Sequence, residues 1–475
     1  MLSVTEAARE AGAKLAIVAG EQTISFEELS RRVQELSAKI EKVTAPGRPI
    51  AFVANHTLDS LFLLYSLLEL GRPALPLNPR LLPSDHRALI ELAGAFQVSL
   101  SSGDLNVSAS SAAQSLDMRS PAVLVATSGT TGPAKLVKLS QKGLIAAADA
   151  SADRLGWTDD DRWLLSLSLC HVGGLSIATR CLLARRPVVL GEPRGNAAEL
   201  LRLIKTHDVT LVSLVSTQLH RLLAGDFDLK GTKLRIMLLG GMKADPWIVA
   251  AARTRGLPVL TTYGMTEMAS QIATQIPADL RSLIGPCHDV GPALSQVEVK
   301  IIKDEIVVRG PMLFDGYVGD AIEVDSMRGP YTTGLSIRHG WFHTGDWGLL
   351  DANGRLTVIG RAADRIVTGG ENVAPAEVEL ALEALPAIER ACVFGVPEAV
   401  KGEQVVAAII LREGFLLDLA EFESLIAERL APFKRPRAWA ILEEFAVTAT
   451  GKLDRAATAR MAVPQLQIME HRRTS

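Results

Sequence analysis

Nine residues in the first third of the chain have the types and the spacing that phosphate binding requires. They run from Thr127 to Lys135 with the sequence TSGTTGPAK and directly follow the apolar run 122–126. Glycines let backbone N–H groups approach an anion closely, hydroxyl groups add donors, and a lysine adds a positive charge. The stretch therefore indicates a polyphosphate-binding loop at the end of a short buried strand.

This loop differs from a Walker A loop, which ends in Gly-Lys-Ser/Thr and opens a helix. Here two residues separate Gly132 from Lys135, and the following residues 136–139 have an extended pattern. A run of Ser, Thr and Gly is by itself more often an ordinary surface loop. The phosphate interpretation consequently depends on the rest of the chain.

Several other predicted strands end in glycine or polar residues. The strand 163–167 leads to His171, the strand 234–239 to Gly240 and Gly241, and the strand 259–262 to the stretch YGMTE. A helix that begins near residue 216 places Arg221 one turn in. In open α/β sheets ligands bind at the carboxyl ends of strands, although a lone histidine is more often structural than catalytic.

Composition restricts the class of protein. A chain of 475 residues exceeds what one core supports and predicts two or three domains. The net charge of −3 argues against nucleic-acid and anionic-membrane partners, because both require a concentrated positive field, and favours small-molecule partners. The four cysteines lack CxxC spacing, which predicts neither a zinc site nor a disulfide framework but buried thiols in a reducing compartment.

Two apolar stretches bear on whether the protein is secreted or spans a membrane. Residues 1–14 lack the apolar stretch of a signal peptide, and the apolar run 61–70 is too short to span a bilayer. We therefore expect a soluble cytoplasmic protein. Nothing in the sequence decides whether it forms a homo-oligomer.

Hydrophobic periodicity predicts an α/β chain. Strands and helices alternate from residue 16 to residue 77, which indicates a largely parallel sheet with helices on its faces. The Ser- and Ala-rich residues 101–120 are expected to be a linker. Further on, a helix over 375–385, a second apolar helix face over 419–430 and the strands 391–396, 405–411 and 438–442 predict a compact α+β unit.

Five motifs occur in the order found in adenylate-forming enzymes, the superfamily of acyl-CoA synthetases, peptide-synthetase adenylation domains and firefly luciferase, and the chain resembles that superfamily over essentially its whole length. These motifs are Thr127–Lys135, Tyr263–Glu267, Trp341–Asp346, Gly360–Asp364 and Thr448–Lys452. The resemblance implies a large layered α/β N-terminal domain, residues 1–360, that binds ATP and an acid. It also implies a small mobile α+β C-terminal domain, residues 361–475.

Such enzymes join a carboxylate to AMP and release pyrophosphate, and the acyl-CoA synthetases among them then pass the acyl group to the thiol of coenzyme A. The resemblance gives catalytic roles to Lys452, Thr266, Glu267 and His171, with Glu267 also helping to bind Mg²⁺, whose hard charge favours oxygen ligands. The implied ATP-binding residues are Thr127, Ser128, Gly129, Thr130, Thr131, Gly132, Lys135, Gly240, Gly241, Tyr263, Gly264, Asp346 and Arg361. The resemblance places Gly240, Gly241 and Tyr263 around adenine, and it places Asp346, with Arg361 nearby, at the ribose hydroxyls.

Within the superfamily, stretches such as YGMTEMASQIAT, residues 263–274, resemble the o-succinylbenzoate–CoA ligase branch of menaquinone and phylloquinone biosynthesis. That acid has two carboxylates, so we expect Arg221, with its bidentate fork, to hold the aromatic one. Ser270 and His171 would line the same pocket, and Gly369 and Gly370 would face coenzyme A.

Three alternatives stay open. Another aryl- or fatty-acyl-CoA ligase would share every ATP motif, and an amino-acid adenylating domain would usually carry an aspartate for the substrate amine. A catalytically silent nucleotide-binding protein would be expected to lack Lys452 or Glu267, and both are present. The chain departs from the usual pattern at Ala134, Leu136, the hinge position Ala363 and the opening of the lysine motif, 446–448.

Overall fold

The structure, a computed structural model, separates into two compact units. It describes residues 2–101, 104–108, 121–127, 135–191, 197–225, 229–241, 245–282, 285–319, 322–325, 329–332, 337–338, 340–361, 364–398, 402–415, 419–447 and 453–468. Unit 1 comprises Met1–Lys300, Val308–Phe342 and Leu350–Leu356; unit 2 comprises Ile301–Val307, His343–Leu349 and Thr357–Ser475. Four strands contribute residues to both units: β16 (Glu298–Ile302), β17 (Glu305–Arg309), β21 (Trp341–Leu350) and β22 (Arg355–Arg361).

One sheet of unit 1 carries the predicted phosphate loop at its edge. Its order among the described residues is β6-β5-β3-β4-β7-β8. The strands are β3 (Ile50–Val53), β4 (Ala74–Leu77), β5 (Phe96–Ser101), β6 (Asp104–Ser108), β7 (Val123–Thr127) and β8 (Lys135–Leu139). The inner strands β5, β3, β4 and β7 are parallel, whereas β6 and β8 close the two edges as antiparallel hairpins.

A second sheet of unit 1 gathers the other predicted strand ends. Its order within the described ranges is β14-β13-β12-β11-β9-β10-β1-β2. The strands are β1 (Leu15–Ala19), β2 (Gln22–Ser25), β9 (Trp163–Leu165), β10 (Val188–Leu190), β11 (Leu211–Leu214), β12 (Ile236–Leu239), β13 (Val259–Met265) and β14 (Ser270–Thr274). The six strands from β13 to β1 are mutually parallel, so their carboxyl ends share one edge.

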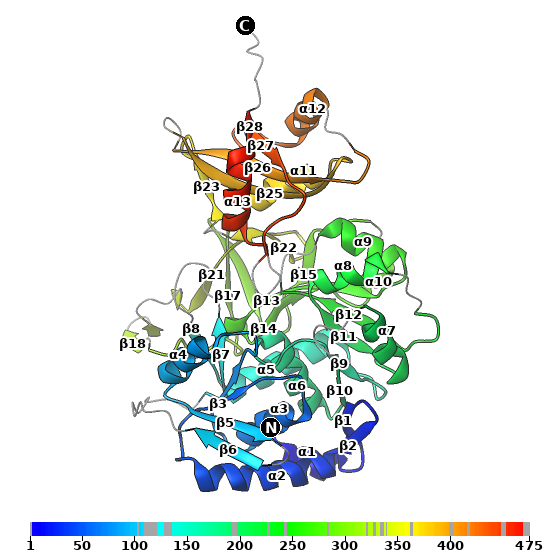
Figure 1. Cartoon of the computed structure of the whole chain (residues 1–475), viewed down its shortest axis with the longest axis vertical. Helices are drawn as coiled ribbons and strands as arrows, with labels where there is room; N and C mark the ends of the chain where they lie inside the picture. Colours follow the sequence, from blue (N-terminus) through cyan, green and yellow to red (C-terminus); the bar gives the residue numbers. More distant parts are fainter. Residues whose placement is uncertain are drawn as a thin grey trace. The chain divides into compact units, whose positions relative to one another are not determined.

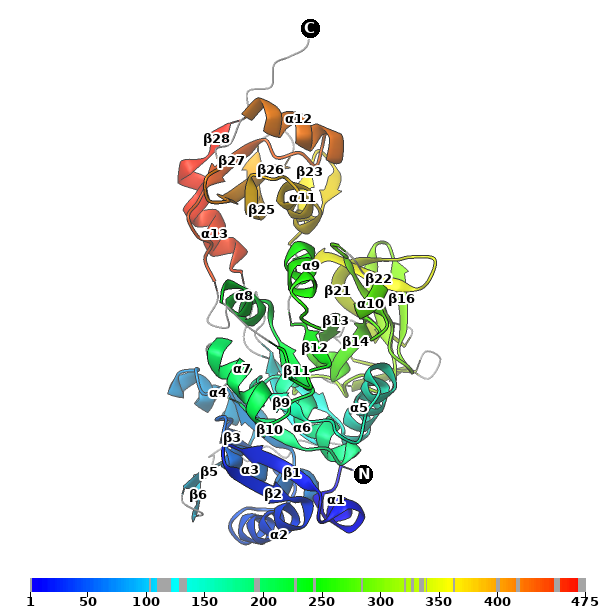
Figure 2. The same cartoon turned by 90° about the vertical axis from the view of Figure 1, so that its right-hand side faces the viewer.

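Helices cover both sheets of unit 1, as Figures 1 and 2 show. They are α1 (Val4–Ala11), α2 (Phe26–Val43), α3 (Leu58–Glu69), α4 (Pro83–Ala93), α5 (Gln141–Leu155), α6 (Val172–Ala184), α7 (Ala197–Thr206), α8 (Ser216–Ala224), α9 (Pro246–Thr254) and α10 (Asp279–Ser282). The predicted cap of α2 is confirmed: the Ser25 side chain accepts a hydrogen bond from the Glu28 N–H at 3.1 Å. Helix α3 is apolar almost all round and buried, as expected for a helix between layers.

Unit 2 holds the small α+β fold that the sequence predicts. Its own sheet runs β24-β23-β26-β27-β28, with β25 paired to β26, within the described residues. The strands are β23 (Ile366–Thr368), β24 (Glu371–Val373), β25 (Ile388–Glu398), β26 (Gly402–Leu411), β27 (Ala438–Ile441) and β28 (Gln467–Ile468); the helices are α11 (Pro375–Glu383), α12 (Leu419–Arg429) and α13 (Arg455–Ala462). Val378 and Leu382 of α11 pack in the same core as Phe422 and Ile426 of α12.

The predicted α/β layering is therefore confirmed, but one expectation is wrong. Part of the supposed linker 101–120 is strand β6, which pairs along its whole length with β5. The Ser-rich composition hid an alternating pattern in which Leu105 and Val107 are half-buried while their neighbours Asp104 and Asn106 are exposed. Residues 109–120 lie outside the described part of the chain.

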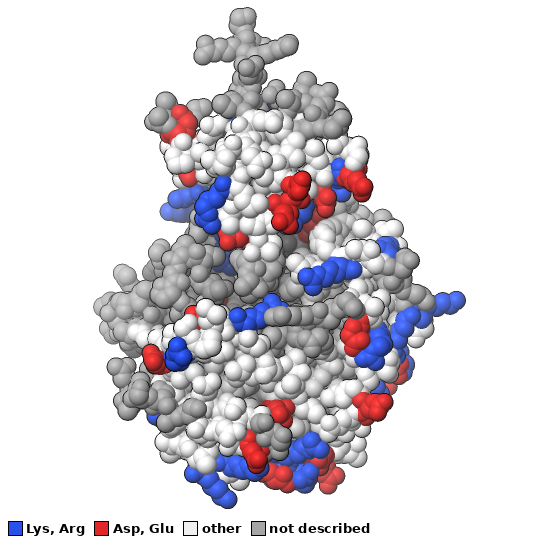
Figure 3. Space-filling view, in the orientation of Figure 1, with Lys and Arg blue, Asp and Glu red and all other residues white. Residues whose placement is uncertain are grey.

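Surface charge and helix character agree with the composition. On the face seen in Figure 3, basic and acidic side chains are interspersed, in keeping with a net charge of −3. Among the described helices, none combines the length and the apolar character needed to cross a lipid bilayer. Of the cysteines, Cys170, Cys181 and Cys392 are buried free thiols, and Cys287 is half-buried.

Candidate functional site

The two ends of the predicted phosphate loop face each other across a β-hairpin. Thr127 ends β7, Lys135 begins β8, and the two residues are Cα partners in the antiparallel ladder. The Thr127 hydroxyl donates to the Lys135 carbonyl oxygen at 3.4 Å. Residues 128–132, also predicted to bind ATP, lie outside the described residues. The hairpin thus places a lysine and a threonine at the base of the loop.

A tyrosine joins this hairpin to the predicted metal-binding glutamate. The Lys135 ammonium lies 4.8 Å from the centre of the Tyr317 ring, within the range of a cation–π contact. The Tyr317 hydroxyl donates to Glu267 Oε1 at 2.8 Å. Glu267 lies in the short 3-10 helix η1 (Thr266–Met268), directly after β13. The structure therefore brings Lys135 and Glu267 together through a side chain that the sequence analysis did not select.

The turn after Glu267 has unusual backbone geometry. Ala269 and Ser270 have φ values of 49° and 122°, which L-residues with a side chain rarely adopt. Ser270 then pairs with Met265, and a Cβ on the nearby Gly264 would lie 1.8 Å from the Ser270 carbonyl oxygen. Gly264 is thus required by this close approach of β13 and β14, which positions Ser270 next to the predicted adenine-binding strand.

The glycines after β12 also have a steric explanation. A Cβ on Gly240 would lie 2.8 Å from Thr262 Cγ2, and Gly241 has φ +81°. The Gly240 N–H donates to the Leu214 carbonyl oxygen at 3.1 Å. Tyr263, half-buried, follows Thr262 on the neighbouring parallel strand β13. Gly240 is therefore explained by its close contact with Thr262, and the placement of these residues at adenine stays a prediction.

His171 and Arg221 follow two strands of the same sheet. His171 is exposed and is the N-cap residue of α6, six residues beyond the end of β9 rather than directly at the strand end. Arg221 lies on the exposed side of α8, the helix that follows β11, while Leu219 and Leu222 face the core. Both residues therefore follow strands whose carboxyl ends share the edge that carries Gly240.

Burial excludes one alternative nucleophile at this edge. Cys170 precedes His171, which on sequence alone could suggest a Cys–His pair. Burial raises the pKa of the Cys170 thiol, and this outweighs its contact with Ser168 Oγ at 3.1 Å. A thiol with a raised pKa holds little thiolate and is a poor nucleophile.

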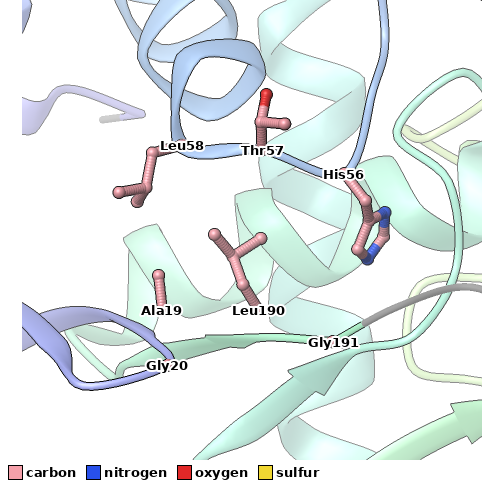
Figure 4. Close-up of a pocket in the computed structure, with 7 residues that line it drawn as sticks. All are labelled: Ala19, Gly20, His56, Thr57, Leu58, Leu190 and Gly191. Carbon is pink, nitrogen blue, oxygen red and sulfur yellow. The ribbon is translucent and has the colours of Figure 1, made fainter. Parts of the chain in front are cut away.

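A cavity of about 260 Å³ lies further along the same sheet, at the carboxyl ends of β1 and β10 (Figure 4). It is lined by Ala19, Gly20, His56, Thr57, Leu58, Leu190 and Gly191. The His56 ring nitrogen Nε2 bonds to the carbonyl oxygen of Leu165, the last residue of β9. None of the predicted site residues lines this cavity. The His56 contact fixes the end of β9, the strand that precedes His171.

In unit 2, Asp346, which the resemblance places at the ribose, forms an ion pair with Arg361. Asp346 Oδ1 lies 2.8 Å from Arg361 Nε, with Asp346 buried and Arg361 exposed. The Asp346 N–H donates to Thr344 Oγ1 at 3.0 Å, and that hydroxyl donates to the Ile306 carbonyl oxygen at 2.7 Å. Asp346 therefore lies in the middle of β21 (Trp341–Leu350), where its N–H bonds to Thr344 and its carboxylate pairs with Arg361.

A second carboxylate supports this segment. Glu305 accepts hydrogen bonds from the Gly345 N–H at 3.0 Å and from His343 Nδ1 at 2.7 Å. Gly345 has φ +69°, which favours glycine. Glu305 thus fixes the backbone of β21 immediately before Asp346.

Four other predicted positions remain to be described. Gly369 and Gly370 form the two-residue turn between β23 and β24, with φ values of 58° and 85°. Lys452 and the hinge residue Ala363 lie outside the described residues. For these two positions the sequence-based predictions stay predictions.

The carboxylate of Glu267 is a ligand of the kind that Mg²⁺ binds. Magnesium usually takes one or two protein carboxylates and obtains its remaining ligands from phosphate and water. One carboxylate beside a phosphate loop fits this pattern. Within the described ranges, no cluster of three or more His, Cys, Asp or Glu residues could hold a metal ion by itself.

Sequence reasoning missed Tyr317 and Glu305. Tyr317 lies 50 residues from Glu267, and Glu305 lies 40 residues from Gly345. Spacing carries no information on contacts at such separations. The available indication was local: Tyr317 is one of only four tyrosines and follows a glycine in the stretch FDGY.

Comparison with known proteins identifies the class. Residues 97–318 match the AMP-binding enzyme family, and residues 377–452 match the AMP-binding enzyme C-terminal domain. The chain belongs to the AMP-binding enzyme family. The resemblance to adenylate-forming enzymes and the predicted fold of that type, with a large N-terminal and a smaller C-terminal domain, are thereby confirmed.

Individual relatives are similar over nearly the whole length. A 2-succinylbenzoate–CoA ligase of Listeria innocua is 32% identical over 91% of this chain and 93% of that protein. The corresponding ligase of Geobacillus kaustophilus is 33% identical over 94% of this chain and 95% of that protein. The solved structure of Bacillus subtilis o-succinylbenzoate CoA synthetase with its acyl-adenylate intermediate has a TM-score of 0.80, 29% identity, and coverage of 95% and 96%. The structure of the same enzyme with ATP and a magnesium ion has a TM-score of 0.79 and 29% identity, and the match covers 96% of this chain and 98% of that chain.

Proposed function

We propose that this chain is an AMP-forming acid–thiol ligase, a 2-succinylbenzoate–CoA ligase. It would activate 2-succinylbenzoate (o-succinylbenzoate) with ATP to an acyl-adenylate and pyrophosphate, then form the CoA thioester and release AMP. The geometric observation that best supports this activity is that Tyr317 contacts both Lys135 and Glu267 at the base of the phosphate loop. The substrate is supported by relatives named for this reaction over more than nine-tenths of the chain.

The first half-reaction brings two anions together, so its acceleration depends on cations and donors fixed in advance. The loop 127–135, with Lys135, would hold the β- and γ-phosphates, and Thr266 would contact the α-phosphate. Mg²⁺, held by Glu267, would neutralise phosphate charge.

The adenosine part would be bound by two groups of residues. Gly240, Gly241 and Tyr263 would form the adenine slot, and Gly264 would also contact ATP. Asp346 would accept hydrogen bonds from the ribose hydroxyls, with Arg361 beside it. The observed 2.8 Å pair between these two residues supports their shared role.

The C-terminal residues would act in both half-reactions. We assign residues 1–360 to the adenylation domain and 361–475 to a mobile domain that reorients at Ala363. Lys452 would bridge the carboxylate and the α-phosphate during adenylation. Gly369 and Gly370 would face the pantetheine arm during thioester formation.

The acid pocket must hold one carboxylate while the other reacts. Arg221 would bind the aromatic carboxylate through its bidentate fork, and Ser270 and His171 would line the pocket. The positions of α6 and α8 after parallel strands of one sheet support this grouping. The exposure of Arg221 is suited to a residue that meets a charged substrate from solvent.

ATP–pyrophosphate exchange with a panel of acids tests the proposal. We expect 2-succinylbenzoate to support exchange best and CoA addition to yield its thioester. Faster exchange with a simple benzoate or a medium-chain fatty acid would favour the rival acyl-CoA ligase. Exchange without transfer to CoA would favour an adenylating domain of another kind.

The cellular setting follows from the same assignment. We propose a cytoplasmic enzyme that serves menaquinone or phylloquinone biosynthesis with small-molecule substrates. Its oligomeric state, left open by the sequence, can be measured by light scattering of the purified protein.

A further inference from the structure

Tyr317 contacts both charged groups that the proposed chemistry uses first. Its ring faces the Lys135 ammonium at 4.8 Å, and its hydroxyl donates to Glu267 Oε1 at 2.8 Å. Lys135 and Glu267 come from separate elements, β8 and η1, and are 132 positions apart in sequence. One side chain therefore governs how these two groups are placed relative to each other.

The backbone that carries Tyr317 is fixed from two sides. On one side it pairs with β8: the Lys138 N–H donates to the Gly316 carbonyl oxygen at 3.0 Å, and the Val318 N–H donates to that of Leu136 at 2.9 Å. On the other side the Phe314 N–H donates to the Glu267 carbonyl oxygen at 2.8 Å. The segment 314–318 is thus a bridge between the loop hairpin and η1.

Aromatic packing fixes the ring itself. Phe314 is buried and meets the Tyr317 ring edge-to-face, with centroids 5.0 Å apart and planes at 65°. Phe314 in turn packs against Phe342 at 5.4 Å and 80°. Edge-to-face pairs are a favourable aromatic arrangement, so this packing holds the Tyr317 side chain in the position from which its hydroxyl reaches Glu267.

The charges suggest why a tyrosine suits this position. Lysine and glutamate in direct contact would form an ion pair that satisfies both groups without any ligand. A cation–π contact at an exposed site is weak, so Lys135 can leave it for a phosphate oxygen. A carboxylate has about four lone-pair sites, so one bond from Tyr317 orients Glu267 and leaves acceptor capacity for a metal ion.

We propose that Tyr317 is a positioning residue that orients Glu267 toward Mg²⁺ through its hydroxyl and holds Lys135 ready for phosphate through its ring. This role rests on the proposed function of the same site. It goes beyond packing, because packing requires only the ring, whereas orientation of Glu267 requires the hydroxyl.

Two substitutions separate the hydroxyl from the ring. In Tyr317→Phe the ring remains and the hydrogen bond to the carboxylate is lost. Such bonds correspond to about tenfold or more in an equilibrium constant. We expect the Mg²⁺ concentration needed for half-maximal ATP–pyrophosphate exchange to rise about tenfold. Binding of a fluorescent ATP analogue in EDTA should be unchanged.

In Tyr317→Leu the cation–π contact is lost as well. Binding of the same analogue in EDTA should then weaken about two- to fivefold, the factor expected for an exposed cation–π contact. Tyr65→Phe is the matched control, because it removes a buried hydroxyl that donates to the Ala178 carbonyl oxygen at 3.1 Å and not to Glu267. It should change the melting temperature without changing the Mg²⁺ requirement.

A direct binding measurement keeps this role distinct from the choice of substrate. Mg²⁺ is titrated into each protein with the ATP analogue, and fluorescence reports the metal dependence of binding. If no acid supports exchange, the proposed function fails, while this titration still decides the role of Tyr317. A wild-type Mg²⁺ dependence in Tyr317→Phe would overturn the inference and leave Tyr317 as a packing residue.

Discussion

The carboxylate of Glu305 offers a sharp test of how the predicted ribose site is held. Glu305 accepts hydrogen bonds at 3.0 Å from the Gly345 N–H and at 2.7 Å from His343 Nδ1. Its side chain is 25% exposed and that of His343 is 17% exposed. A hydrogen bond to a charged group contributes about 1.5–3 kcal/mol, and partial exposure favours the lower value for each bond.

Two substitutions should give graded effects. Glu305→Gln keeps an oxygen for the Gly345 N–H but loses the charge, so about 1.5 kcal/mol is removed; Glu305→Ala removes about 3 kcal/mol. In the variants, ATP binding must supply the free energy that orders the segment with Asp346. The KM for ATP should therefore rise up to about tenfold in Glu305→Gln and up to about 100-fold in Glu305→Ala. The KM for the acid should change little in both.

The assay is ATP–pyrophosphate exchange at saturating acid, with melting temperature measured in parallel. Glu298→Gln is the control, because the Glu298–Arg309 pair is 2.7 Å long but its side chains are 55% and 45% exposed. Exposed pairs contribute little, so its KM for ATP should equal the wild-type value. A lowered melting temperature with an unchanged KM for ATP in Glu305→Ala would refute the reasoning and make Glu305 purely structural.

Two further predictions concern the half-reactions and the acid. Lys452→Ala should abolish adenylate formation yet leave thioester formation from supplied acyl-adenylate largely intact, whereas Ala363→Pro should do the reverse because a fixed φ restricts the hinge. Single-turnover assays of each step check this, and equal loss of both steps in either variant would contradict it. Arg221→Ala should raise the KM for 2-succinylbenzoate steeply, since losing a charge-assisted pair to a carboxylate buried in the bound state costs about 2–5 kcal/mol, and leave the KM for ATP unchanged; an unaltered acid KM would remove Arg221 from the pocket.

The elements of this fold were largely predictable because their information is local. The strand ending at Leu239 and the helix capped by Ser25 each follow from a few adjacent residues. Strand β6 was missed because a Ser-rich stretch has low strand propensity, and its pairing with β5 outweighs that preference. Local composition could not reveal this pairing partner.

The candidate site was predictable in part for the same reason. Motif residues such as Lys135, Glu267 and Asp346 carry their own local pattern, but the residues that orient them do not. Tyr317 and Glu305 act through contacts that exist only once distant segments pair. The sequence therefore indicated which groups do chemistry more readily than which groups position them.

The glycines at positions 369 and 370 can be explained either by the geometry of their turn or by a role in binding coenzyme A. Positive φ at both central residues is what a two-residue type I′ hairpin requires, and the register Thr368↔Glu371 closes that hairpin. The glycines are thus explained without coenzyme A. Asn-Gly is also favoured in this turn, so Gly369→Asn keeps the backbone geometry while adding a side chain.

This substitution can separate the two explanations. If Gly369 lets the pantetheine arm approach, Gly369→Asn should keep the wild-type melting temperature but raise the KM for CoA several-fold in thioester formation from supplied acyl-adenylate. Gly369→Val is the comparison, because a β-branched residue at positive φ costs about 1–2 kcal/mol or more and should lower the melting temperature. A Gly369→Asn variant with wild-type stability and a wild-type KM for CoA would show that the glycine serves only the turn, because the added side chain would then meet no substrate.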